Sequence, residues 1–288
     1  MKPLPKLSYA QESDPWLKQK IVNFIEVITG RNQLTEIYDN LKDEPFLSPR
    51  FFSRGIELGK LELSYNRAEE QTIPQAGPLV FIANHPFGII DGLILCEIAA
   101  RTRGDFRILL NNRLMKDEDL NHLFLPIDFD GTREASRKNV ETKRNAQKVL
   151  DHAGTIIIFP SGGVATRGHY GLGPLEEFPW STFAAKIIMK SEATVIPVNF
   201  NGENSFFFHL VSGFSEAARL SLFIREVTRR MGTKIEFTIG KPISYIEMRK
   251  VGDRKALTEY LKKKVDDLSP TPPRAGLSFL SRGNSSCR

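Results

Sequence analysis

The chain has 288 residues, of which 41% are hydrophobic and 26% are charged, with two cysteines and a net charge of +6. This composition is ordinary for a globular protein and excludes a wholly disordered chain, a collagen and a disulfide-linked scaffold. The length fits one large domain or two small ones. Because the sequence has neither a run of about 18 apolar residues nor an apolar signal-like N-terminus, we expect a reduced, intracellular protein without a spanning helix.

Residues 1–58 are predicted to form an N-terminal helical segment. Residues 16–28 place apolar side chains on one helical stripe, and further helices are predicted at about 34–41 and 49–58. Such helices cap a sheet or lie on a membrane. The last 20 residues, 269–288, hold ten Pro, Gly and Ser together, which predicts a disordered tail.

Residues 59–268 are predicted to form the main domain, an α/β fold with a mostly parallel sheet flanked by helices. The predicted strands are residues 79–83, 106–110, 124–128, 155–159, 194–199 and 235–239, with an edge strand at about 61–65. Helices are predicted from about residue 91 to 102 and at 134–152, 181–190, 215–230 and 247–268. This alternation of strands and helices is typical of a parallel sheet. Pro197 predicts that its strand is an edge strand or a bulged one.

Positive charge is concentrated near the C-terminus. Residues 215–264 contain 13 Lys or Arg and 6 Asp or Glu, a net charge of +7, so the other residues sum to −1. A basic face attracts phosphates, nucleic acid or anionic lipid, and the 20 phenylalanines favour a membrane surface over nucleic acid. The competing interpretation is a solvated basic helix face over a Phe-rich core.

The strongest functional signal is the segment LVFIANHPFGIID, residues 79–91. His85 follows a buried strand, where ligands bind in an open parallel sheet, and Asp91 lies near the start of the next helix. A carboxylate on one imidazole nitrogen fixes the tautomer, so the other nitrogen can take a proton from a hydroxyl. The alternatives are that Asp91 is only a helix N-cap and His85 only a loop histidine with satisfied hydrogen bonds.

A second signal is TIIIFPSGGVAT at residues 155–166, another strand followed by a glycine-rich turn. Gly162 and Gly163 permit positive φ angles, and their amides are candidates to hold an oxyanion or a phosphate. Arg167 follows directly. The alternative is an ordinary turn after a strand. Ser161 is not a nucleophile elbow, because the residue two positions before it is not glycine.

Two weaker signals complete the set. The segment LFLPIDFDGTR at residues 123–133 offers Asp128, Asp130 and Arg133 as site candidates, and TVIPVNFNGEN follows at residues 194–204. The segment GHYGLG at residues 168–173 does not follow a strand in the dinucleotide-binding pattern, so dinucleotide binding is excluded.

These four blocks, in this order over roughly residues 60–245, resemble the glycerolipid acyltransferases, that is the 1-acyl-sn-glycerol-3-phosphate (lysophospholipid) acyltransferase family. The matching segments are NHPFGIID, LPIDFD, FPSGG and VIPV. The resemblance implies that His85 is the base activating a lipid hydroxyl and that Asp91 supports it. The hydroxyl then attacks an acyl thioester on acyl carrier protein or coenzyme A, with no acyl-enzyme, cofactor or metal.

Three features depart from the family pattern, and the last two are at positions that the family uses to handle the glycerol phosphate. Five residues rather than four separate His85 from Asp91, Phe129 replaces an arginine of the second motif, and Ser161 replaces a glutamate of the third. The spacing is similar to the branch long labelled hemolysin and to the O-acyltransferases of ornithine lipid. We reject pore formation, because the sequence has no export signal and no membrane-inserting hairpin.

The sequence thus predicts a peripheral O-acyltransferase at the cytoplasmic face of the membrane. Its partners are membrane lipids and an acyl carrier protein or coenzyme A thioester, not nucleic acid, and its acceptor is a lyso-ornithine or other amino-acid lyso-lipid, or lysophosphatidic acid. Seven residues are expected to contact the substrates: Asn84, Asp128, Arg133, Ser161, Gly162, Gly163 and Arg167. The rival functions are a lipid or thioester hydrolase using the same His–Asp pair and a non-catalytic lipid-binding protein.

Overall fold

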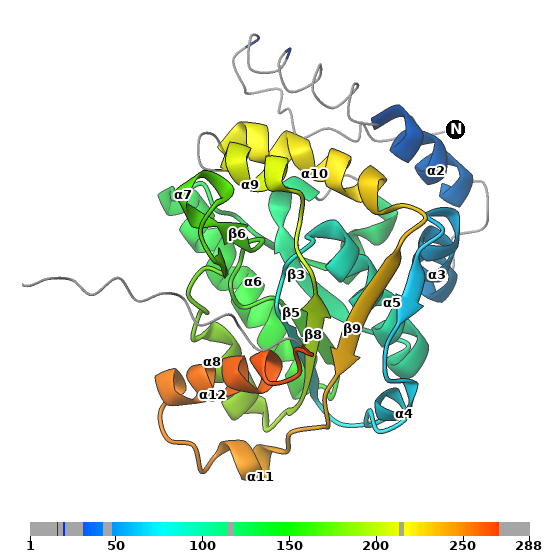
Figure 1. Cartoon of the computed structure of the whole chain (residues 1–288). Helices are drawn as coiled ribbons and strands as arrows, with labels where there is room; N and C mark the ends of the chain where they lie inside the picture. Colours follow the sequence, from blue (N-terminus) through cyan, green and yellow to red (C-terminus); the bar gives the residue numbers. More distant parts are fainter. Residues whose placement is uncertain are drawn as a thin grey trace, which may run out of the picture.

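The computed structural model describes residues 16, 20, 31–42, 48–114, 118–212 and 216–270, and Figure 1 shows how their elements are arranged. In chain order these elements are α2 (Arg31–Lys42), α3 (Ser48–Leu58), β1 (Glu62–Ser64), α4 (Arg67–Glu70), β2 (Leu79–Ala83), α5 (Ile89–Arg103), β3 (Arg107–Asn111), the 3₁₀ helices η1 (Asn112–Leu114) and η2 (Glu118–Leu123), β4 (Phe124–Ile127), α6 (Arg133–Asp151), β5 (Thr155–Ile158), β6 (Thr166–Arg167), α7 (Gly168–Gly171), β7 (Leu175–Glu176), α8 (Phe183–Ser191), β8 (Thr194–Asn201), α9 (Phe206–Ser212), α10 (Glu216–Arg230), β9 (Lys234–Ile239), α11 (Tyr245–Met248) and α12 (Arg254–Asp266).

Seven of the strands form one sheet in the order β1-β9-β8-β2-β5-β3-β4. The five strands from β8 to β4 are mutually parallel. Strand β9 runs antiparallel to β8, and β1 pairs with β9 in parallel. The short strands β6 and β7 pair separately. The predicted α/β class with a mostly parallel sheet is confirmed.

Both faces of the sheet are covered by helices, as strand β2 illustrates. Leu79, Phe81 and Ala83 lie in the core cluster that includes residues of α3 and α5. Val80 and Ile82 point to the other face and lie in the cluster with residues of α6, α8 and α12. A strand buried on both faces reads as a continuous apolar run, which is why its sequence shows no alternation.

The described part of the N-terminal segment packs on this same core. Helix α3 buries Phe52 and Ile56, and the Phe52 ring lies 5.7 Å from that of Phe106. The helix predicted at 16–28 lies outside the described residues except for positions 16 and 20, and so does the predicted tail beyond residue 270. None of the helices in the described ranges is long and apolar enough to cross a membrane.

The Pro197 strand is not an edge strand, because β8 lies inside the sheet between β9 and β2, but its irregular pairing agrees with the other predicted possibility, a bulged strand. The Pro197 carbonyl accepts the Gly240 amide at 2.8 Å, so the missing amide hydrogen of Pro197 faces the β9 side. The pairing there is irregular, since two residues of β8 oppose three of the partner chain between the pairs Val198–Ile239 and Val195–Ile243. The ladder from β8 to β2 therefore stays intact.

The single helix predicted at 247–268 is also wrong, because the structure has two helices there, α11 and α12. Gly252 adopts a φ of 114°, which stops the first helix. Asp253 then caps the second, its carboxylate accepting the Ala256 amide hydrogen at 2.8 Å. The apolar periodicity continues across this break, which explains the error.

Helices α9 and α10 cross one end of the sheet, and α11 lies at the opposite end (Figure 1). The α9–α10 end is the one at which β2, β5 and β8 terminate, since α9 follows β8 directly. In an open parallel sheet this carboxyl end is where ligands bind.

Candidate active site

The candidate site begins where β2 ends, at Ala83. The side chain of the next residue, Asn84, donates to the Phe200 carbonyl at 2.9 Å and accepts the Phe200 amide at 2.7 Å. Asn84 therefore ties the carboxyl ends of β2 and β8 together. Its predicted contact with substrate stays a prediction, because both polar groups of its side chain are already bonded to the backbone.

His85 and Asp91 meet as the sequence predicts. The Nδ1 atom of His85 lies 3.0 Å from Oδ2 of Asp91, and the Asp91 side chain is fully buried. The same Oδ2 accepts the backbone amides of Phe87 at 2.8 Å and Gly88 at 2.9 Å. Burial raises the pKa of Asp91, and the hydrogen bond from His85 opposes this rise. The N-cap of α5 is Gly88, so the expectation that Asp91 is itself the N-cap is wrong; Asp91 is the third residue of the helix and its carboxylate bonds back to the Gly88 amide. The same carboxylate contacts the imidazole, and its role in catalysis stays a prediction.

His85 is held from three further directions. Its backbone amide donates to Glu177 Oε1 at 2.8 Å, and its carbonyl accepts the Ala165 amide at 2.9 Å. Its ring stacks on Phe159 with centroids 4.0 Å apart. The side chain is 17% exposed, so part of the ring is reachable from solvent. A carboxylate on Nδ1 favours the tautomer that leaves Nε2 free to accept a proton.

Glu177 was not found from the sequence. Its second oxygen accepts the Trp180 indole hydrogen at 3.0 Å, and burial raises the pKa of its carboxyl group. Because Glu177 binds the backbone of a residue 92 positions away, no local pattern marks it.

The glycine-rich turn after β5 lies beside the histidine. Gly162 adopts a φ of 66° and donates its amide to the Phe159 carbonyl at 3.0 Å. The Ser161 hydroxyl donates to the Gly163 carbonyl at 2.9 Å. Ser161 and the Gly162 amide therefore shape the turn, and their substrate contacts stay predictions. Among the described residues the Gly163 amide has no hydrogen-bond partner, and the same is true of the Ser161 and Val164 amides, so the predicted contact of Gly163 with an oxyanion stays a prediction.

Two exposed aromatic rings border this turn. A Cβ atom on Gly162 would lie 3.6 Å from the Phe129 ring, and one on Gly163 would lie 2.9 Å from the Phe178 ring. Side chains at both positions would therefore crowd the rings, most severely at Gly163. The turn and the two rings form an apolar border next to His85.

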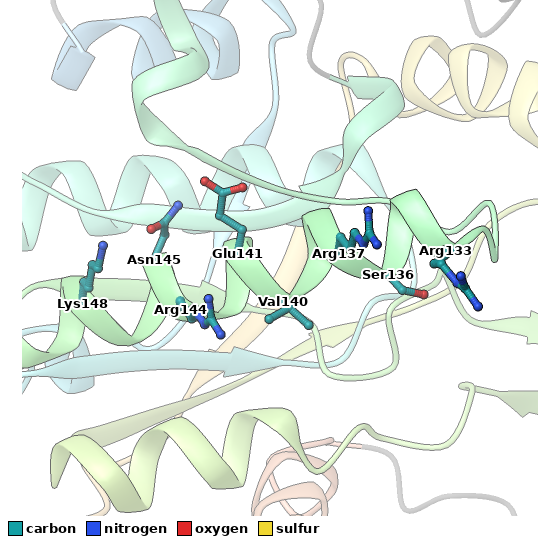
Figure 2. Close-up of a pocket in the computed structure, with 8 residues that line it drawn as sticks. All are labelled: Arg133, Ser136, Arg137, Val140, Glu141, Arg144, Asn145 and Lys148. Atoms are coloured by element: carbon teal, nitrogen blue, oxygen red, sulfur yellow. The ribbon is translucent and has the colours of Figure 1, made fainter.

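Asp128 and Arg133 precede and follow Phe129 in the sequence. Asn139 bonds both the amide of Asp128, at 2.8 Å, and its carbonyl, at 2.7 Å, which fixes the end of β4 to α6. Arg133 begins α6 and lines a groove along that helix (Figure 2). The groove is lined by residues of α6 alone and is mostly basic: Arg133, Ser136, Arg137, Val140, Glu141, Arg144, Asn145 and Lys148. Within the described part of the chain, neither Asp128 nor Arg133 has a hydrogen bond or ion pair with His85, so their predicted roles stay predictions.

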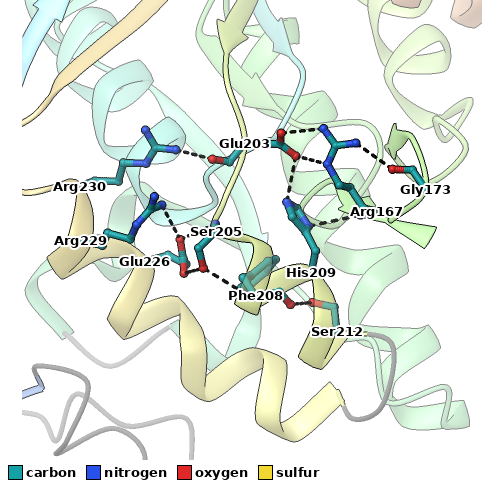
Figure 3. Close-up of polar contacts among 10 residues, drawn as sticks. All are labelled: Arg167, Gly173, Glu203, Ser205, Phe208, His209, Ser212, Glu226, Arg229 and Arg230. Atoms are coloured by element: carbon teal, nitrogen blue, oxygen red, sulfur yellow. Dashed lines mark hydrogen bonds and ion pairs between the residues drawn. The ribbon is translucent and has the colours of Figure 1, made fainter. Parts of the chain in front are cut away.

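Arg167 has a second role that the sequence did not indicate. Its guanidinium group binds both oxygens of Glu203, at 2.5 and 2.7 Å, and the Gly173 carbonyl at 2.8 Å (Figure 3). The buried His209 adds to the network, with Nε2 3.2 Å from Glu203 Oε2. Arg167 lowers the pKa of Glu203, and burial lowers that of His209. These contacts use three of the five N–H donors of Arg167, so its predicted contact with a headgroup stays a prediction and would use the remaining two.

Arg230 is a further cation that the sequence analysis missed. Its guanidinium group lies 4.3 Å from the centre of the Phe87 ring, inside the His85–Asp91 loop, and it also bonds the Glu203 carbonyl. Burial lowers the pKa of Arg230, and the Asp91 carboxylate opposes this. Its Nε atom and both polar atoms of the neighbouring Asn204, which is 3% exposed, are buried without partners in the described ranges.

The described residues contain no group of three or more His, Cys, Asp or Glu side chains placed to hold a metal. The chain matches a family model described as acyltransferase over residues 36–270. The chain belongs to this acyltransferase family. The family assignment confirms the predicted relationship and makes the protein an enzyme, which excludes the non-catalytic alternative.

Two curated relatives are both called lyso-glycine lipid O-acyltransferase. The protein from Phocaeicola vulgatus is 26% identical over 247 residues, covering 80% of this chain and 81% of the relative. The one from Bacteroides thetaiotaomicron is 24% identical over 255 residues, covering 86% and 89%. The crystal structure of 1-acyl-sn-glycerophosphate (LPA) acyltransferase from Thermotoga maritima superposes with a TM-score of 0.50 at 16% identity over 86% of each chain, which shows a shared fold.

Proposed function

We propose that this protein transfers a fatty acyl group from a thioester donor to the hydroxyl of a lyso-lipid, with His85 as general base. The observation that carries this proposal is the 3.0 Å contact of His85 Nδ1 with the fully buried Asp91 carboxylate. A positioned base of this kind contributes roughly 10²–10⁴-fold to a rate. The donor is an acyl carrier protein or coenzyme A thioester, and the enzyme works at the cytoplasmic face of the membrane as a peripheral protein.

The chemistry needs only these residues and the two substrates. His85 Nε2 takes the hydroxyl proton while the hydroxyl oxygen attacks the thioester carbonyl, and Asp91 stabilises the imidazolium that forms. In this proposal the Gly163 amide, which has no hydrogen-bond partner among the described residues, donates to the carbonyl oxygen as that oxygen gains negative charge. The tetrahedral intermediate then collapses, the carbon–sulfur bond breaks, and the thiolate takes the proton from His85. The products are an ester and a free thiol.

The acceptor we propose is a lyso-lipid with an amino-acid headgroup. The two curated relatives are named for a lyso-glycine lipid. In this chain Phe129 and Ser161 replace the charged side chains that the 1-acyl-sn-glycerol-3-phosphate acyltransferase motifs have at these positions. Arg167, another candidate for a headgroup contact, is bound to Glu203. A lyso-lipid in which an amino acid is linked through its amino group to an acyl chain keeps the free carboxylate of that amino acid. An enzyme that binds this headgroup needs a cation near the position of the acceptor hydroxyl.

We infer that Arg230 is that cation. It lies over Phe87, two residues after His85, and its Nε atom has no partner among the described residues. Arginine binds carboxylates through paired hydrogen bonds, and such charge-assisted bonds are worth roughly 1.5–3 kcal/mol. Asn204, buried beside Glu203, offers a further donor.

The test is a competition among three acceptors: lyso-glycine lipid, lyso-ornithine lipid and lysophosphatidic acid. Each is offered to the full chain with labelled acyl carrier protein and acyl coenzyme A donors. We expect label in the doubly acylated amino-acid lipid. A clear preference for lysophosphatidic acid would contradict the acceptor assignment, and label recovered only as free fatty acid would support the hydrolase.

The role of Arg230 has its own test. Arg230→Gln is expected to raise KM for lyso-glycine lipid by about tenfold or more, the equivalent of one charge-assisted hydrogen bond. It should change KM much less for the carboxamide analogue of the same lipid. Equal effects on the two acceptors would show that Arg230 acts only on the structure of the loop.

A further inference from the structure

Three large apolar side chains are exposed close together at the carboxyl end of the sheet. Leu172 is 81% exposed, Phe206 is 56% exposed and Phe207 is 47% exposed. A Cβ atom on Gly171 would lie 3.1 Å from the Phe206 ring, so this ring lies against the chain segment that carries Leu172. The 20 phenylalanines favour a membrane surface, but the sequence alone does not show which of them are exposed. Phe208, next in the chain, is fully buried.

This apolar group is fixed to the catalytic loop by a chain of contacts. The buried Phe208 ring packs on Phe223 with centroids 5.2 Å apart. The Phe223 ring in turn lies 3.1 Å from the position of a Cβ atom on Gly88, between His85 and Asp91. Helices α7 and α9 lie at the same end of the molecule as the carboxyl end of β2, where the candidate active site begins (Figure 1). Phe206 and Phe207 are on α9, and Leu172 directly follows α7.

Basic side chains border the same group. The Arg225 guanidinium lies 5.2 Å from the centre of the Phe207 ring, and Arg229 is about half exposed. Both form ion pairs with the buried Glu226, Arg225 at 3.2 Å and Arg229 at 3.6 Å. Figure 3 shows the pair of Arg229 and Glu226. With Arg167, Arg230 and Glu203, four guanidinium groups face two carboxylates here, which leaves an excess of positive charge.

We propose that Leu172, Phe206 and Phe207, together with Arg225 and Arg229, form a docking face for an anionic lipid bilayer. Aromatic and aliphatic side chains that enter the headgroup region, bordered by arginines, are the features that bind proteins to such interfaces. Docking through this face turns the His85 end toward the bilayer, which shortens the path of a lipid acceptor. The proposal rests on the lipid substrate of the proposed function, but the docking itself is measured without turnover.

The experiment compares binding of the full chain to two kinds of sedimented vesicle. One contains phosphatidylcholine alone, and the other also contains about 30% phosphatidylglycerol, which gives the vesicle a negative surface potential. The test variant is Phe206→Ser/Phe207→Ser. The matched control is Ile246→Ser, because Ile246 is 60% exposed on α11 at the opposite end of the molecule.

We expect the double variant to lower the partition coefficient by about 70-fold for each ring that is fully buried in the bilayer, since burying the exposed half of a phenylalanine removes about 100 Å² of apolar surface from water. Ile246→Ser should bind as the unchanged protein does. Arg229→Gln should weaken binding about fivefold on the anionic vesicles only, and salt should reduce that part of the binding.

Two results would overturn the proposal: unchanged vesicle binding by the double variant, or an equal loss in the Ile246→Ser control. Both results are independent of acyl transfer. Failure of the proposed function would instead appear as absence of turnover on every acceptor while vesicle binding still depends on Phe206 and Phe207.

Discussion

Replacing Asp91 with Asn separates the two roles that the structure gives this residue. One oxygen, Oδ2, accepts the amides of Phe87 and Gly88 and contacts His85 Nδ1. The carbonyl oxygen of an asparagine can keep these contacts, but it carries no negative charge. The substitution therefore removes the stabilisation of an imidazolium at His85 and leaves the start of α5 in place.

The expected magnitudes differ widely between rate and stability. In Ser-His-Asp enzymes the same change lowers kcat by about 10⁴, so we expect a loss of about 10²–10⁴ here. The free energy of unfolding should change by less than about 1 kcal/mol, because both amide hydrogens keep an acceptor. Asp91→Ala leaves both buried amides unpaired, at about 1–3 kcal/mol each, and should therefore destabilise the fold as well.

The assay measures kcat on a lyso-lipid acceptor and urea unfolding for both variants. Asp91→Asn should be stable and nearly inactive, whereas Asp91→Ala should be unstable and inactive. The reasoning is refuted if Asp91→Asn keeps more than about a tenth of the original kcat. It is also refuted if that variant loses as much stability as Asp91→Ala while its folded fraction turns over normally.

Three further predictions follow from the surroundings of the site. Arg167 lowers the pKa of Glu203, so their ion pair stabilises the fold fully above the unfolded pKa of about 4.3, and this stabilisation is lost as the pH falls through the lower folded pKa. The difference in unfolding free energy between the original protein and Glu203→Gln should therefore be largest near neutral pH and should shrink below about pH 4. A difference that does not change with pH would contradict this prediction. Gly202→Ala should lower both the midpoint of urea unfolding and the activity. The backbone φ of Gly202 is 131°, which strains any other residue, and the new Cβ atom would lie 2.7 Å from the Phe87 ring. An unchanged midpoint would count against the close packing of Gly202 on Phe87. Cys96 is buried and burial raises the pKa of its thiol, so alkylation of the native protein should proceed only at the rate of unfolding, and rapid labelling would show an open site.

The central pair of the site was predictable because its signal is local. His85 and Asp91 are six positions apart, and a strand followed by a helix forces that spacing into one loop. The α/β class was predictable for a similar reason, since each buried strand is a short apolar run. Both inferences need only the spacing of apolar residues along the chain and the fact that parallel strands end at the same edge of a sheet.

The surroundings of the pair depend on distant segments and were not predictable. Glu177 bonds His85 from 92 residues away, and Arg167 bonds Glu203 from 36 residues away. Arg230 reaches Phe87 from α10. Charged side chains in such positions look like ordinary surface residues in the sequence, because nothing local shows which partner they meet or that they are buried.

The most direct test of the account is the lipid profile of a host that expresses this protein beside one that expresses His85→Gln at the same level. Glutamine keeps a polar side chain of similar length but cannot act as a base at neutral pH. The account predicts that the original protein accumulates a doubly acylated lipid with a matching loss of its lyso form, and that His85→Gln restores the profile of the empty host. Equal accumulation by the two proteins, with both shown to be folded, would contradict a mechanism in which His85 activates the acceptor hydroxyl.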